Sequence, residues 1–109
     1  MKPLEEHKEE LIENLINDGW RTEVNDLEYE EEIYCVKAQK KMLVFFNRTH
    51  IYVLVKEVHE DNFERLVDLV KNNFVTYHAV WLVADSFSEE VKNYAGENQQ
   101  IGLIKIEVE

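Results

Sequence analysis

Cysteine and glycine are scarce in this sequence, and their scarcity excludes several kinds of site. Cys35 is the single cysteine, so no disulfide forms within the chain, and its apolar neighbours indicate a small core residue. Gly19, Gly96 and Gly102 lie far apart, so there is no glycine-rich phosphate loop. The four histidines lack HxxxH or HExxH spacing, and neither CxxC nor GxSxG occurs. We therefore expect no cofactor and no bound metal.

Long apolar segments are also missing. No run approaches the roughly 20 residues of a transmembrane helix. The segment 1–10 is acidic and polar, unlike a secretory signal. Hydrophobic residues nevertheless make up 45% of the 109 residues, which suffices for one packed core and is too much for a disordered chain. We expect a single domain over residues 1–109, located in the cytoplasm and without membrane contact.

Basic residues are outnumbered, with 12 Lys and Arg against 23 Asp and Glu, giving a net charge of −11. Nucleic-acid binding depends largely on cations that neutralise phosphates, so this balance disfavours DNA or RNA as a partner. It favours a protein partner or a homodimer. A local basic patch is the alternative, formed by residues that are close in sequence: Lys37, Lys40, Lys41 and Arg48. The charge balance favours reading these four residues as a solvated hairpin turn.

Hydrophobic periodicity predicts the elements of the first half of the chain. A helix is expected over 3–18, with apolar residues on one face and Gly19 as its stop. Strands are expected over 20–24 and 33–38, followed by a polar turn at 39–41. The unbroken apolar run at 42–46 is typical of a strand covered on both faces. A break at 47–50 precedes a further apolar run at 51–55, which is either a strand or an extension of the hairpin.

The second half alternates helices and strands. A helix is expected from Asp61, capped by Asp61 and Glu64, with Phe63 and Val67 on its buried face. A buried strand follows at 79–84 and contains Trp81. A third helix with Tyr94 inward and a last strand over 101–108 complete the chain. This alternation requires some parallel strands joined by crossovers, so we predict a three-layer α/β/α sandwich with a mixed central sheet.

Several segments occur in an order found in a known superfamily. They are GWRTEV at 19–24, IYCV at 33–36, LVFFN at 43–47, IY at 51–52, FERL at 63–66, VWLVA at 80–84, FSEE at 87–90 and IGLI at 101–104. In this order they resemble the restriction-endonuclease-like, or PD-(D/E)xK, superfamily, in particular Mrr-type enzymes and archaeal Holliday junction resolvases. The resemblance covers nearly the whole chain and implies the same sandwich fold.

The resemblance also implies an active site. The superfamily holds a divalent metal with an Asp in one strand and an acid in the next, and a Lys two residues later acts on the attacking water. The matching positions are Tyr34, Phe45 and Asn47, which supply neither carboxylate nor ammonium. The run LVFF favours Tyr34 and Phe45 as core residues over an exposed docking patch. A second register keeps Lys56 but places Leu54 at the acid position.

These replacements predict a catalytically inactive nuclease-like domain that acts as a protein-interaction or regulatory module. Two alternatives stay open. One is a metal-dependent DNA nuclease whose acids have migrated to the segment carrying Glu28, Glu30, Glu31 and Glu32, which we otherwise interpret as a solvated acidic turn. The other is a non-catalytic DNA-binding module that uses the four basic residues near the predicted hairpin.

Overall fold

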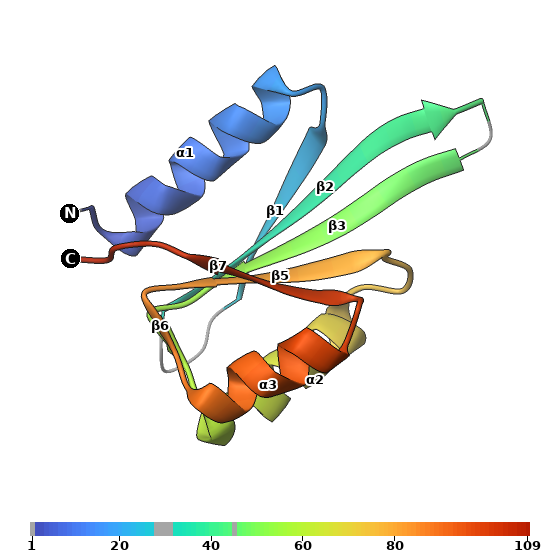
Figure 1. Cartoon of the computed structure of the whole chain (residues 1–109). Helices are drawn as coiled ribbons and strands as arrows, with labels where there is room; N and C mark the ends of the chain where they lie inside the picture. Colours follow the sequence, from blue (N-terminus) through green and yellow to red (C-terminus); the bar gives the residue numbers. More distant parts are fainter. Residues whose placement is uncertain (1, 28–31, 45) are drawn as a thin grey trace.

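The structure, a computed structural model, describes residues 2–27, 32–44 and 46–109 (Figure 1). Its elements in chain order are α1 (Leu4–Asn17), β1 (Arg21–Leu27), β2 (Ile33–Leu43), β3 (Phe46–Leu54), β4 (Glu57–Val58), α2 (Glu60–Asn73), β5 (Ala79–Ala84), β6 (Ser86–Phe87), α3 (Glu89–Glu97) and β7 (Ile101–Lys105). In these parts of the chain, no helix is long and apolar enough to cross a membrane.

The central sheet is mixed, as the alternation of elements predicted. Within the described residues its strand order is β1-β2-β3-β5-β7. The pairs β1–β2 and β2–β3 are antiparallel, whereas β3–β5 and β5–β7 are parallel. β4 and β6 form a separate short parallel pair. Helix α1 lies on one face of the sheet and α2 and α3 lie on the other (Figure 1), so the predicted three-layer α/β/α sandwich is confirmed.

Alternation along the strands divides the apolar residues between two cores. Cys35, Ile51 and Leu82 point toward α2 and α3, and all three are fully buried. Val36 and Leu54 point toward α1 and are also fully buried. Each face of the central strands is therefore sealed by helix, which explains why these strands read as continuous apolar runs.

The β2–β3 hairpin differs from the prediction. The segment 39–41 is not a turn, because β2 continues through it and Lys40 pairs with Arg48. The segment 42–46 is not a buried strand: Leu43 is 72% exposed and Val44 is 74% exposed, at the end of the hairpin. An apolar run shows only that residues are apolar, and the pairing ladder decides where the chain turns. The predicted break at 47–50 is likewise part of β3.

The helix ends follow local hydrogen bonding. Gly19, at φ 91°, ends α1 as predicted, and the backbone N–H of Trp20 donates to the carbonyl of Leu15 at 2.9 Å. The predicted cap of α2 at Asp61 and Glu64 is wrong. Asn62 serves instead: its side-chain oxygen accepts from the backbone N–H of His59 and its amide nitrogen donates to the carbonyl of Glu57, both at 2.8 Å. An amide satisfies a donor and an acceptor at once, which a carboxylate cannot.

Candidate functional site

The positions at which the resemblance places catalytic residues lie at opposite ends of the β2–β3 ladder. Tyr34 pairs with Leu54 at one end, and Asn47 pairs with Lys41 near the other. The first register is therefore wrong as a single site, because the structure does not bring Tyr34 and Asn47 together. Phe45 lies outside the described residues. The second register is the one that puts its acid position, Leu54, directly opposite Tyr34.

The end of the sheet around Leu54 is filled by apolar packing. Leu54 is 0% exposed and belongs to one buried cluster with Leu4, Val83 and Val108. Half-buried Tyr34 packs on this cluster and donates its hydroxyl hydrogen to the Glu32 carboxylate at 2.7 Å. The aliphatic side chains of this cluster offer a cation no oxygen ligand.

The segments near the two ends of the chain lie side by side (Figure 1), and Leu4 and Val108 of these segments belong to this cluster. Lys2 and Val108 form a parallel bridge, and the backbone N–H of Glu109 donates to the Lys2 carbonyl at 2.9 Å. The His7 ring nitrogen Nε2 lies 2.6 Å from the carbonyl oxygen of Glu107. The segment after β7 is therefore hydrogen-bonded to the start of α1. Together these two segments cover the cluster that contains Leu54.

A cavity of about 290 Å³ remains beside the sealed cluster. It is lined by Pro3, Leu4, Glu32, Val55, Lys56, Glu57, Val108 and Glu109. In the described parts of the chain, no group of three or more His, Cys, Asp or Glu side chains is placed to hold a metal ion. Of the acidic segment considered above, Glu32 is described and is hydrogen-bonded to Tyr34. Glu28, Glu30 and Glu31 lie outside the described residues.

The four basic residues of the hairpin do not form one patch. Strand alternation puts Lys40 and Arg48 on the α1 face and Lys37 and Lys41 on the opposite face. Lys40 also donates to the backbone oxygen of Asp18 at 2.8 Å. The cations therefore flank the hairpin on two sides, unlike the single stripe that tracks a phosphate backbone.

An aromatic cluster on the α1 face was not found from the sequence. His50 lies 4.9 Å from Trp20 and 6.2 Å from Trp81 between ring centroids, and the Trp81 indole donates to His50 Nδ1 at 3.2 Å. Burial, and next the positive charge of Arg48, lowers the pKa of His50. The Trp81 ring lies against Gly102, where an added Cβ would come within 2.3 Å of the ring. This contact arises because β5 and β7 pair in the register that places Trp81 beside Gly102, so the sequence around either residue does not predict it.

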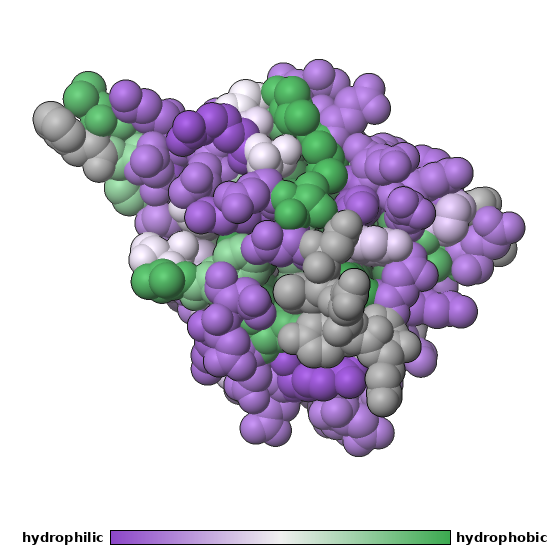
Figure 2. All heavy atoms as spheres, turned by 180° about the vertical axis from the view of Figure 1, so that it is seen from behind, coloured by the Kyte–Doolittle hydropathy of each residue, from purple (hydrophilic) through white to green (hydrophobic). Residues whose placement is uncertain are grey.

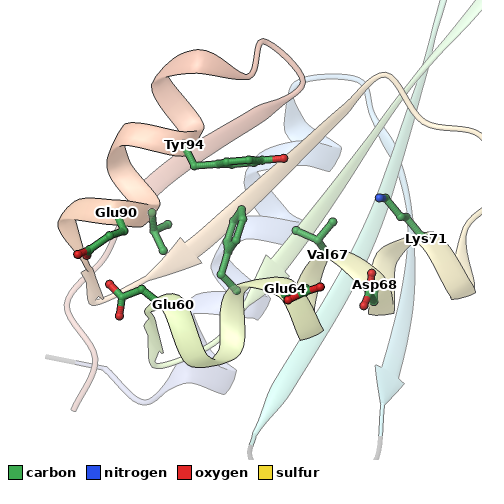
Figure 3. Close-up of a pocket in the computed structure, with 9 residues that line it drawn as sticks. Glu60, Glu64, Val67, Asp68, Lys71, Glu90 and Tyr94 are labelled. Atoms are coloured by element: carbon green, nitrogen blue, oxygen red, sulfur yellow. The ribbon is translucent and has the colours of Figure 1, made fainter.

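A groove runs between α2 and α3 on the other face of the molecule (Figure 3). We call it the α2–α3 groove; its volume is about 490 Å³ and it is lined by Glu60, Phe63, Glu64, Val67, Asp68, Lys71, Glu90, Val91 and Tyr94. The rings of Phe63 and Tyr94 meet edge to face at 5.1 Å. Tyr94 was expected to point inward but is 49% exposed, and Figure 3 shows it extending from α3 along the groove. An amphipathic pattern predicts which side of a helix faces the core, but it does not predict how closely the next helix packs against that side.

Carboxylates line both walls of this groove. Glu60, Glu64 and Asp68 come from α2 and Glu90 comes from α3, with Lys71 at one end (Figure 3). Hydrogen bonding to the Glu90 side chain, and next to Ser88, holds the pKa of Glu60 below its ordinary value. The site thus combines an apolar floor with a negative rim.

Solved structures, but no family, match this chain. No protein-family model matches the sequence, and no curated protein matches it. The apo structure of EndoMS superposes with a TM-score of 0.66 at 14% identity. A repair endonuclease from Pyrococcus abyssi superposes with a TM-score of 0.57 at 17% identity. The fold is restriction-endonuclease-like. Each superposition covers 100% of this chain but 48% and 49% of the two neighbours, so the chain spans about half their length.

Proposed function

We propose that the chain is a catalytically inactive nuclease-like domain that acts as a protein-interaction module. The observation that carries the proposal is Leu54, which is fully buried opposite Tyr34. In the superfamily that the sequence resembles, neighbouring strands present paired acids to a divalent metal. Here the corresponding pair supplies a hydrocarbon and a phenol, and neither is a ligand for a hard cation such as Mg²⁺.

The packing around Leu54 supports loss of catalysis more strongly than the substitution alone. Leu4, 3% exposed, and Val108, 8% exposed, seal the same end of the sheet. A hydrated cation would have to displace this packing, and burying an unpaired charge among apolar groups is strongly unfavourable. The neighbouring structures are described as an endonuclease and EndoMS, but an activity of those proteins does not pass to this chain through the fold alone.

Charge supports a protein partner over nucleic acid. The chain carries a net charge of −11, and its hairpin cations lie on opposite faces of the sheet. The α2–α3 groove offers an apolar floor of the kind that binds side chains of a partner. A regulatory role would act through such contacts.

One observation favours the alternative of a nuclease with migrated acids. Glu32, Glu57 and Glu109 line one cavity together with Lys56, at the end of β3. These groups would replace the strand acids if a metal drew them together. This alternative makes the chain an enzyme and predicts a metal dependence that an inactive domain lacks.

Metal titration and DNA cleavage separate the two possibilities. Mn²⁺ is titrated calorimetrically, and cleavage of duplex and branched DNA is followed with and without Mn²⁺. We expect no saturable binding coupled to cleavage. Cleavage that requires Mn²⁺ and is abolished by Glu32→Gln or Lys56→Ala, but not by the exposed control Glu13→Gln, would overturn the proposal. A gel shift at low salt tests nucleic-acid binding separately.

A further inference from the structure

The β2–β3 hairpin ends in exposed apolar side chains. We call Met42, Leu43, Val44 and Phe46 the hairpin tip; they are 51%, 72%, 74% and 39% exposed. The hairpin projects beyond the rest of the sheet (Figure 1), and hydrophobic atoms mark its end at the upper left of Figure 2. Exposed apolar side chains that gather in one place are typical of contact sites.

Positive charge flanks this tip. The chain has no acidic residue between Glu32 and Glu57, although its net charge is −11. Lys41 and Arg48 are exposed on opposite faces of the hairpin, directly below the tip. The tip is thus an apolar end with a cation on each side.

The α2–α3 groove has the matching chemistry. Its floor is apolar, and carboxylates of α2 and α3 stand on both walls. Tyr94, half exposed, offers the large aromatic surface on which interface energy concentrates. A volume of about 490 Å³ accommodates several aliphatic side chains.

We propose that the hairpin tip of one copy docks into the α2–α3 groove of a second copy. The apolar side chains of the tip pack on the apolar floor of the groove. Lys41 and Arg48 of the same copy pair with the carboxylates on the two walls of the other copy's groove. This inference rests on the proposed function, since it names a second copy as the protein partner. Anionic lipid and DNA present phosphates that the negative body of the chain repels, whereas the groove attracts the cations locally.

The tip and the groove lie on different parts of the surface, so the contact is head to tail (Figure 1). A dimer held by one such contact keeps one free tip and one free groove, and association continues into chains or closes into a ring. The contact is small, so a single link is weak and sensitive to salt.

Sedimentation velocity over a range of protein concentrations tests the inference. Wild type is expected to form species larger than a dimer, and fewer of them as salt rises. The tip variant Leu43→Ser/Val44→Ser and the groove variant Glu64→Lys/Asp68→Lys should each be monomeric alone. An equimolar mixture of the two should give a one-to-one dimer and nothing larger, because one intact tip and one intact groove remain.

Single charge reversals refine the test. Lys41→Glu is expected to weaken association by at least about tenfold, because it places like charges in contact. Lys105→Glu makes the same change of charge on exposed β7 and should have no effect. The altered residues are exposed or line the groove, and unchanged thermal unfolding checks that the variants fold.

Three outcomes overturn the inference. Wild type is monomeric up to millimolar concentration; the tip variant associates like wild type; or wild type floats with phosphatidylserine-containing vesicles and Leu43→Ser/Val44→Ser does not. The last result assigns the tip to a lipid surface. None of these outcomes depends on metal binding or DNA cleavage. The inference can therefore fail while the proposed loss of catalysis stands.

Discussion

The two ends of the β2–β3 ladder use the same residue type in opposite ways. At one end Leu43 is 72% exposed in the hairpin tip, and at the other Leu54 is 0% exposed beneath the joined chain termini. The buried end is where the resemblance expects metal-binding acids, and the exposed end is flanked by cations. This contrast is the one that the proposed inactive, interacting domain requires, with apolar core at the buried end and exposed apolar side chains at the other.

The same substitution at both ends gives the largest expected effect. Leu54→Glu places a carboxylate among Leu4, Val83 and Val108, and we expect the free energy of unfolding to fall by more than about 4 kcal/mol. Leu43→Glu changes an exposed side chain, and we expect a change within about 0.5 kcal/mol. Urea unfolding followed by tryptophan fluorescence measures both.

This pair of variants can break the comparison. If Leu54→Glu unfolds like wild type and gains saturable Mn²⁺ binding, the buried end is an open metal site missing one ligand. The core interpretation would then be wrong. If Leu43→Glu is as damaging as Leu54→Glu, the tip is not exposed in solution.

A pair of glycines, Gly102 in β7 and Gly96 in α3, gives a second contrast between a packed and an open position. A Cβ at Gly102 would lie 2.3 Å from the Trp81 ring, so Gly102→Ala should destabilise the fold by about 1–3 kcal/mol by displacing the indole. Gly96, inside α3, has nothing within 4 Å of an added Cβ, so Gly96→Ala should stabilise by up to about 1 kcal/mol. Thermal unfolding gives both values. Equal effects would mean that Trp81 does not rest on β7.

The start of α3 provides a smaller test at one end of the α2–α3 groove. The Ser88 hydroxyl accepts the backbone N–H of Val91 at 3.3 Å, so Ser88→Ala should cost about 1 kcal/mol. Hydrogen bonding to Ser88 is also the second cause of the lowered pKa of Glu60, which should therefore rise in the variant. NMR titration of the Glu60 carboxyl measures the second effect. Glu60 without any change in pKa would show that α3 does not approach α2 in this way.

The sequence predicted most elements but misjudged the hairpin. The predicted strand over 79–84 has the same bounds as β5, because a short apolar run of this kind is typical of a strand covered on both faces. The apolar run at 42–46 gave an equally strong prediction of a buried strand, and that prediction was wrong. β2 and β3 continue past the part of the sheet that the helices cover, so the described residues of this run are exposed. Long-range register, which places Leu54 opposite Tyr34 and Trp81 beside Gly102, is not encoded in any local window.

The candidate site was predictable only in part. In either register the positions matched by the resemblance lack two carboxylates, and this follows from the residues alone. The sealing of that end by Val108 was not visible, since it depends on contact between the chain ends. The α2–α3 groove was hidden for the same reason. Phe63 and Tyr94 were each predicted as core residues of their own helices, and the contact between their rings depends on how α2 and α3 pack.

The smallest expected effect concerns His50, which lies midway along β3 between the exposed and buried ends of the β2–β3 ladder. Burial and the charges of Arg48 and His78 lower its pKa below 6.5, so the folded chain binds this proton less readily than the unfolded chain. The resulting stability is fully present above pH 6.5 and is lost as pH falls through the lowered folded-state pKa. His50→Gln retains an acceptor for the Trp81 indole but does not titrate, so its free energy of unfolding should fall less than that of wild type below pH 6.5. Parallel urea unfolding curves across that range measure the difference. Identical profiles would place His50 in water, and the packed region of the sheet would then stop short of the middle of β3.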